Sequence, residues 1–320
     1  MTFRLALAGD TMLGRGVAER LRTDPRAPLV APEVVEAVAS ADLFVLNLEC
    51  CISERGERLA DPRKRFFFRA PPIAAERLAE LGVDAVTLAN NHALDYGPVA
   101  LLDTLDHLDR AGIAHVGAGA DAEAARAPAT IAARAGRMRV VAASDHPAGS
   151  AAGPGRPGIA YVDLRRGEVP AWLMEAVRPE GGNAVLVTPH WGPNMLPEPL
   201  AVVRRAAAAL VGAGATLVAG HSAHVFQGVA GPVLYDLGDF VDDYAIDREL
   251  RNDLGLLWLV TIDDCRPRRL EALPLALEHC HTRLATGDDA AWVVRRFREL
   301  CTRLGTEARH EEGRCVVSLS

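Results

Sequence analysis

The sequence predicts an α/β protein in which two β-sheets, or two halves of one sheet, are flanked by helices. Short apolar runs alternate along the chain with longer amphipathic segments rich in Ala, Leu and Arg, which is the pattern of strands alternating with helices. Some of these segments begin with Pro and end with Gly, as helices prefer. No segment repeats at a fixed period, which argues against a solenoid or a propeller.

The first half of the chain carries three expected strands and three expected helices. Apolar runs predict the strands, at residues 5–9, 43–48 and 83–89. Amphipathic segments predict the helices, at residues 32–40, 71–82 and 98–112.

The second half is richer in strands. Apolar runs predict strands at residues 139–143, 159–164, 184–189, 216–219, 233–237, 256–262, 270–277 and 315–319. Helices are expected at residues 199–212 and about 288–304. Residues 145–158, rich in Gly, Pro, Ser and Ala, predict a loop between two sheet-forming halves. We expect one domain over residues 1–262 and a C-terminal extension of strands and a helix, residues 263–320, packed on it.

The charge pattern excludes some classes of partner. The chain has 42 acidic and 35 basic side chains and a net charge of −7, without a long basic block, so we expect no nucleic-acid partner. The most apolar run, residues 254–262, is far shorter than the roughly 18 residues that suggest a membrane span. Residues 4–8 are too few for a signal-peptide core. The sequence therefore predicts a soluble, cytoplasmic protein without a membrane span.

Polar residues of metal-ligand type follow five of the predicted strands. They are Asp10, the pair Asn47 and Glu49, the run Asn90-Asn91-His92, His190, and the pair His221 and His224. Ligands of open α/β sheets bind beyond the carboxyl ends of the strands, so these groups are expected to meet at one edge. The other six histidines, among them His146, are scattered.

Each of these residues has an ordinary structural explanation when taken alone. An aspartate such as Asp10 after a strand is often a turn former or a helix cap, and His190 alone would suit a hydrogen-bonded, half-buried histidine. Their coincidence at five strand ends favours a metal site. Carboxylate, imidazole and amide groups without a thiolate suit one or two ions of Mn, Fe or Zn. Two ions about 3.5–4 Å apart can clamp a phosphoryl group during hydrolysis.

Six motifs occur in a distinctive order along the chain. They are Gly-Asp-x-Met-Leu-Gly-Arg at 9–15, Asn-Leu-Glu at 47–49, Asn-Asn-His-x-x-Asp-x-Gly at 90–97, His-Trp-Gly at 190–192, Gly-His-x-x-His at 220–224 and Gly-Asp-Phe at 238–240. In this order they resemble the CapA-type family of bacterial capsule, or poly-γ-glutamate, synthesis proteins, which belongs to the calcineurin-like metallophosphoesterases. The resemblance covers about residues 3–244. It implies a layered sandwich of two β-sheets flanked by helices, with the site at the carboxyl ends of the strands.

The resemblance also implies a set of metal ligands. The ligands are Asp10 and His224 for a first ion, Glu49 as the bridging carboxylate, and Asn91, His190 and His221 for a second ion. General metallophosphoesterases begin with Asp-x-His, whereas Met12 takes the histidine position here. The first ion would therefore have one nitrogen ligand fewer.

The same resemblance implies roles in catalysis and substrate binding. His92 matches the histidine that protonates the leaving group, and Asp95 would orient it. Arg15, in a turn that leads into a helix, would hold a phosphate or carboxylate. Asn47 is a weaker candidate for a substrate contact. Asp239 is either a support for a ligand histidine or a turn residue.

Three functions compete at this point. The first is a soluble metal-dependent hydrolase that uses a metal-activated hydroxide on a phosphoric ester of a small anionic substrate, with His92 as general acid. The second is a metal-dependent enzyme that processes or transfers an amide or γ-glutamyl peptide. The third is a catalytically degenerate, metal-binding assembly partner.

The basic residues 63–65 precede three phenylalanines, 66–68. An ordinary strand with a charged lead-in explains this stretch. The alternative is a strand near the site whose charges gather an anionic substrate.

Overall fold

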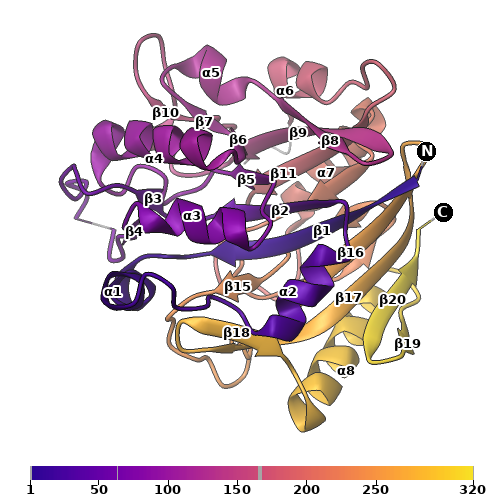
Figure 1. The fold of residues 1–320 in the computed structure, drawn as a ribbon. Coiled ribbons are helices and arrows are strands. Elements are labelled where there is room, and N and C mark those ends of the chain that lie inside the picture. Colours follow the sequence, from indigo (N-terminus) through magenta and orange to yellow (C-terminus); the bar gives the residue numbers. More distant parts are fainter. Residues whose placement is uncertain (1, 63, 165–167, 320) are drawn as a thin grey trace.

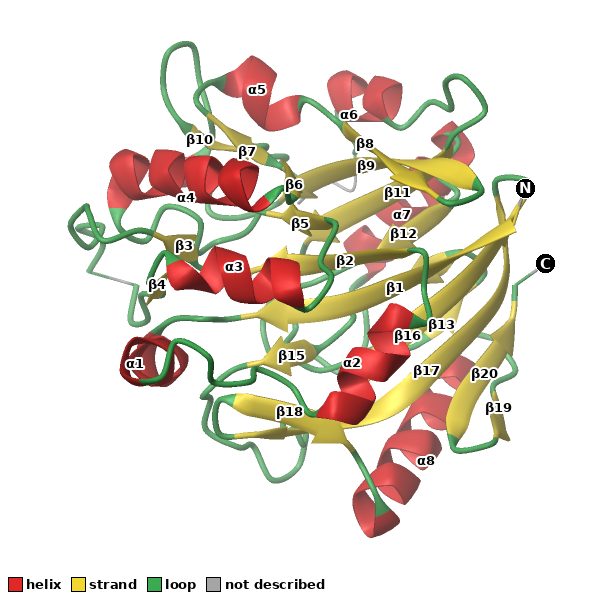
Figure 2. Ribbon diagram, viewed as in Figure 1, coloured by secondary structure: helices red, strands yellow, loops and turns green. Residues whose placement is uncertain are grey.

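Two β-sheets lie face to face, and helices cover both outer sides (Figures 1 and 2). The structure, a computed structural model, describes residues 2–62, 64–164 and 168–319. The prediction of an α/β sandwich of two sheets flanked by helices is confirmed. No helix among these described residues is long and apolar enough to cross a membrane.

The larger sheet has ten strands in the described part of the chain. Its main path is β19 (Arg309–Glu311), β20 (Arg314–Ser318), β17 (Arg266–Glu278), β16 (Leu254–Asp263), β1 (Thr2–Thr11), β2 (Leu43–Leu48), β5 (Ala85–Thr87) and β6 (Ala114–Val116). Two further strands join it, β15 (Asp239–Val241) beside β1 and β18 (His281–Leu284) beside β17. Strands β1, β2, β5 and β6 are parallel, whereas β16 runs antiparallel to β1.

The smaller sheet has six described strands. Their order is β13 (Val229–Ala230), β14 (Val233–Leu234), β12 (Leu217–Ala219), β11 (Ala184–His190), β9 (Gly136–Ser144) and β8 (Ala129–Ala133). The four central strands are parallel to one another. Two short strand pairs complete the described set, β7 (Ala118–Gly119) with β10 (Gly158–Ile159) and β3 (Cys51–Ile52) with β4 (Arg69–Ala70).

Helices flank the two sheets. They are α1 (Arg15–Thr23), α2 (Pro32–Ala39), α3 (Ile73–Glu80), α4 (Gly97–Ala111), α5 (Ala122–Arg126), α6 (Ala171–Ala176), α7 (Ala201–Ala213) and α8 (Gly287–Arg303). A short 3₁₀ helix, Ala148–Ser150, follows β9.

Alternation of apolar side chains along the strands creates the layers. In β1, Leu5 and Leu7 pack toward the smaller sheet, while Ala6 and Ala8 join the core beneath α1 to α4. The outer face of the smaller sheet packs on α6 and α7. Near the carboxyl end of the chain, α8 places Phe297 in the core shared with Trp258 of β16. Both faces of each sheet are therefore buried.

Two expectations about chain organisation are wrong. Residues 145–158 do not separate two halves, because they follow β9 inside the smaller sheet; the chain enters that sheet at β8 and returns to the larger one at β15. A loop rich in Gly and Pro connects elements within one sheet as readily as between sheets. Of the strand expected at 159–164, only Gly158–Ile159 forms β10. The apolar residues after it are buried by packing, with irregular backbone hydrogen bonds.

The phenylalanine stretch also forms no strand over residues 64–68, and Arg63 lies outside the described residues. The nearby strand β4 begins at Arg69. The stretch instead forms hydrogen bonds to the turn that contains Asn91 and Asp95. The backbone N–H of Phe68 donates to Asp95 at 2.6 Å, and the Lys64 ammonium donates to the Asn91 carbonyl at 2.6 Å.

One close backbone contact fixes the strand that carries Asp10. A Cβ atom added at Gly9 would lie 1.7 Å from the carbonyl oxygen of Gly238. The next residue uses the same carbonyl, since the Asp10 N–H donates to the Gly238 oxygen at 2.9 Å. Glycine at position 9 is thus required for the loop before β15 to lie against β1.

We therefore predict that Gly9→Ala destabilises the protein by about 3 kcal/mol or more, since the added methyl group meets rigid backbone. The measurement is the free energy of unfolding from urea denaturation. Gly212→Ala is the matched control: Gly212 lies in α7 with no heavy atom within 4 Å of an added Cβ. It should raise stability by about 0.5–1 kcal/mol. Equal effects of the two variants would contradict the contact.

Candidate metal centre

Strand register brings the polar residues of both sheets to one edge. In the larger sheet, Asp10 of β1 lies opposite Asn47 of β2 on one side and opposite Asp239 of β15 on the other. In the smaller sheet, β11 ends at His190, which forms an isolated parallel bridge with His221 just after β12. The parallel strands of each sheet therefore end at this common edge.

Two carboxylates form the middle of the cluster. Glu49 lies directly after β2, and its Oε1 is 3.9 Å from His190 Nε2 and 4.0 Å from His92 Nε2. Asp10 Oδ1 is 3.5 Å from His221 Nδ1, and Asp10 Oδ2 is 3.3 Å from His224 Nδ1. These are distances between neighbouring polar groups that no strong hydrogen bond joins.

Glu49 is completely buried, and neither of its carboxylate oxygens has a hydrogen-bond partner. Burial, together with the neighbouring charge of Asp10, raises the pKa of Glu49 well above its ordinary value. An ionised carboxylate without a donor is costly in a protein interior. Glu49 therefore lacks a hydrogen-bond donor, and the ring of His224, with Nδ1 at 3.9 Å from Oε2, is a neighbour that can carry positive charge.

The histidines around it are suited to donate lone pairs. Burial lowers the pKa of His190 well below its ordinary value and lowers the pKa of His221 to about 4. The Nδ1 atoms of both rings are buried without a hydrogen-bond partner. Neutral imidazole is the form that binds a metal ion.

His224 lies among three carboxylates. Its Nδ1 is 2.8 Å from Asp239 Oδ1, 3.3 Å from Asp10 Oδ2 and 3.9 Å from Glu49 Oε2. Although burial lowers it, the pKa of His224 is raised overall because Glu49 and Asp10 favour the charged ring. Asp239 itself is buried, with Oδ2 unpartnered.

The donor set fits a transition-metal ion. Asp10, Glu49 and His224 each offer a ligand atom within 4.8 Å of the others. Both carboxylate oxygens of Glu49 are buried without a hydrogen-bond partner. So are the Nδ1 atoms of His190 and His221 and the side-chain oxygen of Asn91. Oxygen and imidazole ligands of this kind suit Mn, Fe or Zn. A bound cation would supply the missing charge.

Two side chains hold the ring of His92 next to this cluster. Its Nδ1 lies 2.7 Å from Asp95 Oδ2, and Phe68 stacks on its ring with 4.1 Å between the centroids. Asp95 in turn forms an ion pair with Lys64, whose Nζ is 2.7 Å from Oδ1. Burial lowers the pKa of His92 to about 4, although Asp95 acts in the opposite direction.

The two predicted substrate contacts are engaged within the protein. The Asn47 amide donates to Asp10 Oδ1 at 2.8 Å and accepts from Asn90 at 3.0 Å, so this side chain orients Asp10. Arg15 lies at the rim, where its guanidinium pairs with Asp243 at 3.0 Å. The same carboxylate accepts the backbone N–H of Gly16 at the start of α1.

Met12 does not replace the missing histidine ligand. Its side chain is fully buried in the core beneath α1 to α4, and its sulfur accepts the backbone N–H of Gly14 at 3.1 Å. Asp239, opposite Asp10 in the register, instead brings a further carboxylate to this side of the cluster.

Sequence reasoning overlooked two features near the site. Lys64, the only lysine of the sequence, contacts both Asp95 and the Asn91 carbonyl. His146 follows β9 and lies 5.2 Å, between ring centroids, from His190. The rule that placed the other ligands after strands would have found His146, because a strand was expected at 139–143.

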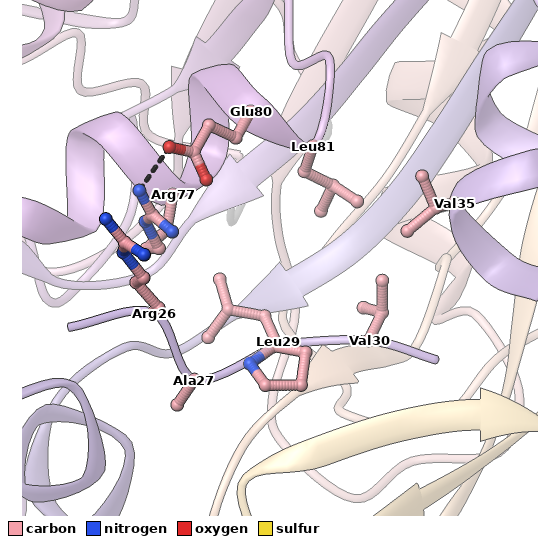
Figure 3. Close-up of a pocket in the computed structure, with 9 residues that line it drawn as sticks. Arg26, Ala27, Leu29, Val30, Val35, Arg77, Glu80 and Leu81 are labelled. Carbon is pink, nitrogen blue, oxygen red and sulfur yellow. Dashed lines mark hydrogen bonds and ion pairs between the residues drawn. The ribbon is translucent and has the colours of Figure 1, made fainter. Parts of the chain in front are cut away.

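A separate hollow of about 210 Å³ lies beside α2 and α3 (Figure 3). It is lined mainly by apolar side chains, among them Leu29, Val30 and Leu81, and its Arg77 pairs with Glu80. It shares no lining residue with the carboxylate–histidine cluster. The cluster at the strand ends is therefore the candidate functional site.

Comparisons with known proteins identify relatives. Residues 4–244 match the family model of the bacterial capsule synthesis protein PGA_cap. A probable polyglutamine synthesis accessory protein of Mycobacterium tuberculosis (strain CDC 1551 / Oshkosh) is 32% identical over 93% of this chain and 91% of its own length. The capsule biosynthesis protein CapA of Bacillus anthracis is 29% identical over 75% of this chain and 59% of its own.

Among solved structures, a putative 5′-nucleotidase from Staphylococcus aureus is similar to this chain at 14% identity and a TM-score of 0.47. The match covers 92% of this chain and 58% of that one.

The buried carboxylate of Glu49 predicts opposite effects of its substitution on stability in metal-free and in metal-loaded protein. In metal-free protein, Glu49→Gln should raise the free energy of unfolding by about 1 kcal/mol or more, because a neutral amide avoids the cost of burying an ionised carboxylate or of protonating it on folding. In wild type, Mn²⁺ at about a hundredfold excess over its Kd should add about 2.7 kcal/mol, and Glu49→Gln should lose most of this gain.

Chemical denaturation with EDTA or with Mn²⁺ measures both effects. Glu54→Gln is the control, because Glu54 is exposed and should change neither value. A metal-induced gain that survives in Glu49→Gln would exclude Glu49 as a ligand.

Proposed function

The chain belongs to the family of bacterial capsule synthesis proteins, and from this premise we propose that it is a metal-dependent hydrolase of phosphoric esters of the calcineurin-like metallophosphoesterase type. The observation that carries the proposal is the environment of Glu49: a fully buried carboxylate without a donor, next to Asp10 and facing imidazoles. The order of the six sequence motifs supports the same superfamily.

The proposal divides the ligands between two positions. Asp10 and His224 would hold one ion, Asn91, His190 and His221 would hold a second, and Glu49 would be shared between them. When bound, such ions polarise a phosphoryl oxygen and make water more acidic. Asn47 and Asp239 orient Asp10 and His224, with which they share hydrogen bonds.

His92 supplies the proton for the leaving group. Asp95 engages Nδ1, which leaves Nε2 as the nitrogen on the side of Glu49. For this step the ring must be protonated at Nε2, a form that the negative charge of a bound phosphoryl group favours although burial lowers the pKa of His92 to about 4. As the bond between phosphorus and the leaving oxygen breaks, His92 passes the Nε2 proton to this oxygen and is protonated again from water. Stacking on Phe68 keeps the ring in place.

Lys64 and Arg15 carry positive charge at the rim. Lys64 is a positioning residue: its ammonium fixes Asp95 and the backbone of Asn91, and so acts on His92 through Asp95. Arg15, with 36% of its side chain exposed, is accessible to an anionic group of the substrate while Asp243 pairs with it. Its guanidinium lies over the rings of Phe68 and Tyr244.

A second candidate function is the processing or transfer of an amide or γ-glutamyl peptide at the same cluster. The name of the mycobacterial relative, a probable polyglutamine synthesis accessory protein, favours it. The third candidate function, that of an assembly partner without catalysis, also agrees with the words "accessory protein" in that name. Substrate panels separate the first two, and metal analysis tests the third.

Other expectations from the sequence remain predictions. They are a small anionic substrate, a cytoplasmic location, the absence of a nucleic-acid partner, and the division into a domain of residues 1–262 and an extension of residues 263–320.

We predict that His92→Asn lowers kcat about a hundredfold or more for an alkyl phosphate and much less for p-nitrophenyl phosphate, because nitrophenolate leaves without a proton. Assays of Mn²⁺-loaded protein measure both rates, and bound metal should be unchanged. His115→Asn is the control, because His115 lies within β6 and pairs with Asp109 rather than with a residue of the cluster.

Wild-type protein that is inert toward a broad panel of phosphomonoesters and diesters would overturn the proposed function. Cleavage of γ-glutamyl peptides instead would establish the second candidate, and protein that binds the metal but cleaves neither class of substrate would favour the third.

Lys64→Met should lower kcat for the alkyl phosphate about ten- to hundredfold with little change in KM, since it removes the support of Asp95 and lets His92 shift. Steady-state kinetics provide the measurement, with p-nitrophenyl phosphate again less affected. Arg65→Met, at the exposed neighbouring position, is the control. If KM alone changed, Lys64 would act on substrate binding rather than on His92.

A further inference from the structure

A histidine–aspartate pair follows β9 at the same edge as the metal-centre residues. Ser144, the last residue of β9, lies opposite His190 in the strand register. Just beyond it, Asp145 engages His146 Nδ1 and also accepts the backbone N–H of Gly192 at 3.1 Å. The ring of His146 is therefore held in place, 5.2 Å from the ring of His190 between centroids.

His146 also lines a groove that leads away from the cluster. The groove has a volume of about 420 Å³, and its apolar walls are Leu164, Pro193, Leu200 and Val202. We call it the β9–α7 groove. His146 thus lies beside a candidate metal ligand and also lines the apolar groove, which places the groove next to the cluster.

The β9–α7 groove has the composition of a binding site for an uncharged group. Leu200, at the N-terminal cap of α7, is 41% exposed and is therefore accessible to an apolar group in the groove. Among the described residues that line it there is no lysine or arginine, and the one carboxylate, that of Asp145, disfavours a second anion. Its volume lies within the usual range of about 300–1,000 Å³ for small-molecule sites, which combine apolar walls with a few polar groups.

We propose that the β9–α7 groove binds the apolar organic part of a phosphoric ester whose phosphoryl group lies at the cluster of Asp10 and Glu49. His146 contacts the substrate where the two parts join, through Nε2, the ring nitrogen that Asp145 does not engage. This inference rests on the proposed function and adds a substrate class: monoesters of alkyl or aryl alcohols rather than an extended polyanion.

The experiment compares non-hydrolysable ligands on Mn²⁺-loaded protein by isothermal titration calorimetry. The probes are inorganic phosphate, methylphosphonate and hexylphosphonate. Wild type should bind hexylphosphonate about tenfold more tightly than methylphosphonate, as expected for partial burial of an alkyl chain. Binding does not depend on turnover, so the result is independent of the rate of hydrolysis.

Leu200→Ser should reduce the preference for hexylphosphonate to about threefold or less. Serine is a favoured helix-capping residue, so α7 should remain intact. Leu102→Ser is the matched control, because Leu102 is 40% exposed on α4 and does not line the groove; it should keep the full preference. His146→Gln should raise KM for hexyl phosphate more than for methyl phosphate.

The outcomes separate the two proposals. Phosphate binding without a preference for hexylphosphonate would overturn the subsite and leave the proposed function intact. Loss of the preference in both leucine variants, or in neither, would also overturn it. If neither phosphate nor any phosphonate binds, the proposed function has failed and the subsite falls with it.

Discussion

The burial of several acidic side chains at one sheet edge is the constraint on which the rest of the structure depends. Those less than a tenth exposed are Asp10, Glu49, Asp95, Asp236, Asp239 and Asp242. Asp236 receives two backbone N–H groups, but both oxygens of Glu49 receive none. The cations at the rim, Lys64 and Arg15, are paired with Asp95 and Asp243. The acidic side chains on this edge therefore differ in how well donors and cations neutralise them. Glu49 has no donor, and a bound cation beside it best explains the ligand set.

Much of the architecture follows from local sequence patterns. The run 43–48 coincides with β2, and helices with clear punctuation, such as α4, begin and end within one or two residues of the prediction. Short edge strands such as β13 and β19 escaped prediction, because two or three residues carry no readable period. Which sheet a strand joins depends on long-range pairing, so the return of β15 and β16 to the larger sheet could not be predicted from composition.

The candidate site was predictable where a ligand-type residue follows a strand, as at Asp10, Asn91 and His190. The site was not predictable where a contact joins two segments that are distant in the sequence. Lys64 approaches Asp95 across 31 positions; the basic stretch 63–65 suggested a place near the site, but nothing in the sequence revealed Asp95 as the partner of Lys64. The opposition of Asp239 to Asp10 depends on the register of β15, which no property of the Gly-Asp-Phe motif reveals.

The antiparallel pairing of β16 with β1 has a consequence for where the chain can be divided. The family match ends at residue 244, yet β16, which covers β1 from Thr2 to Leu7, begins at Leu254. A fragment that stops at the end of the match would leave a long row of backbone groups on β1 open to other chains, an invitation to aggregate. The homologous segment and the smallest piece able to fold are therefore different lengths of polypeptide.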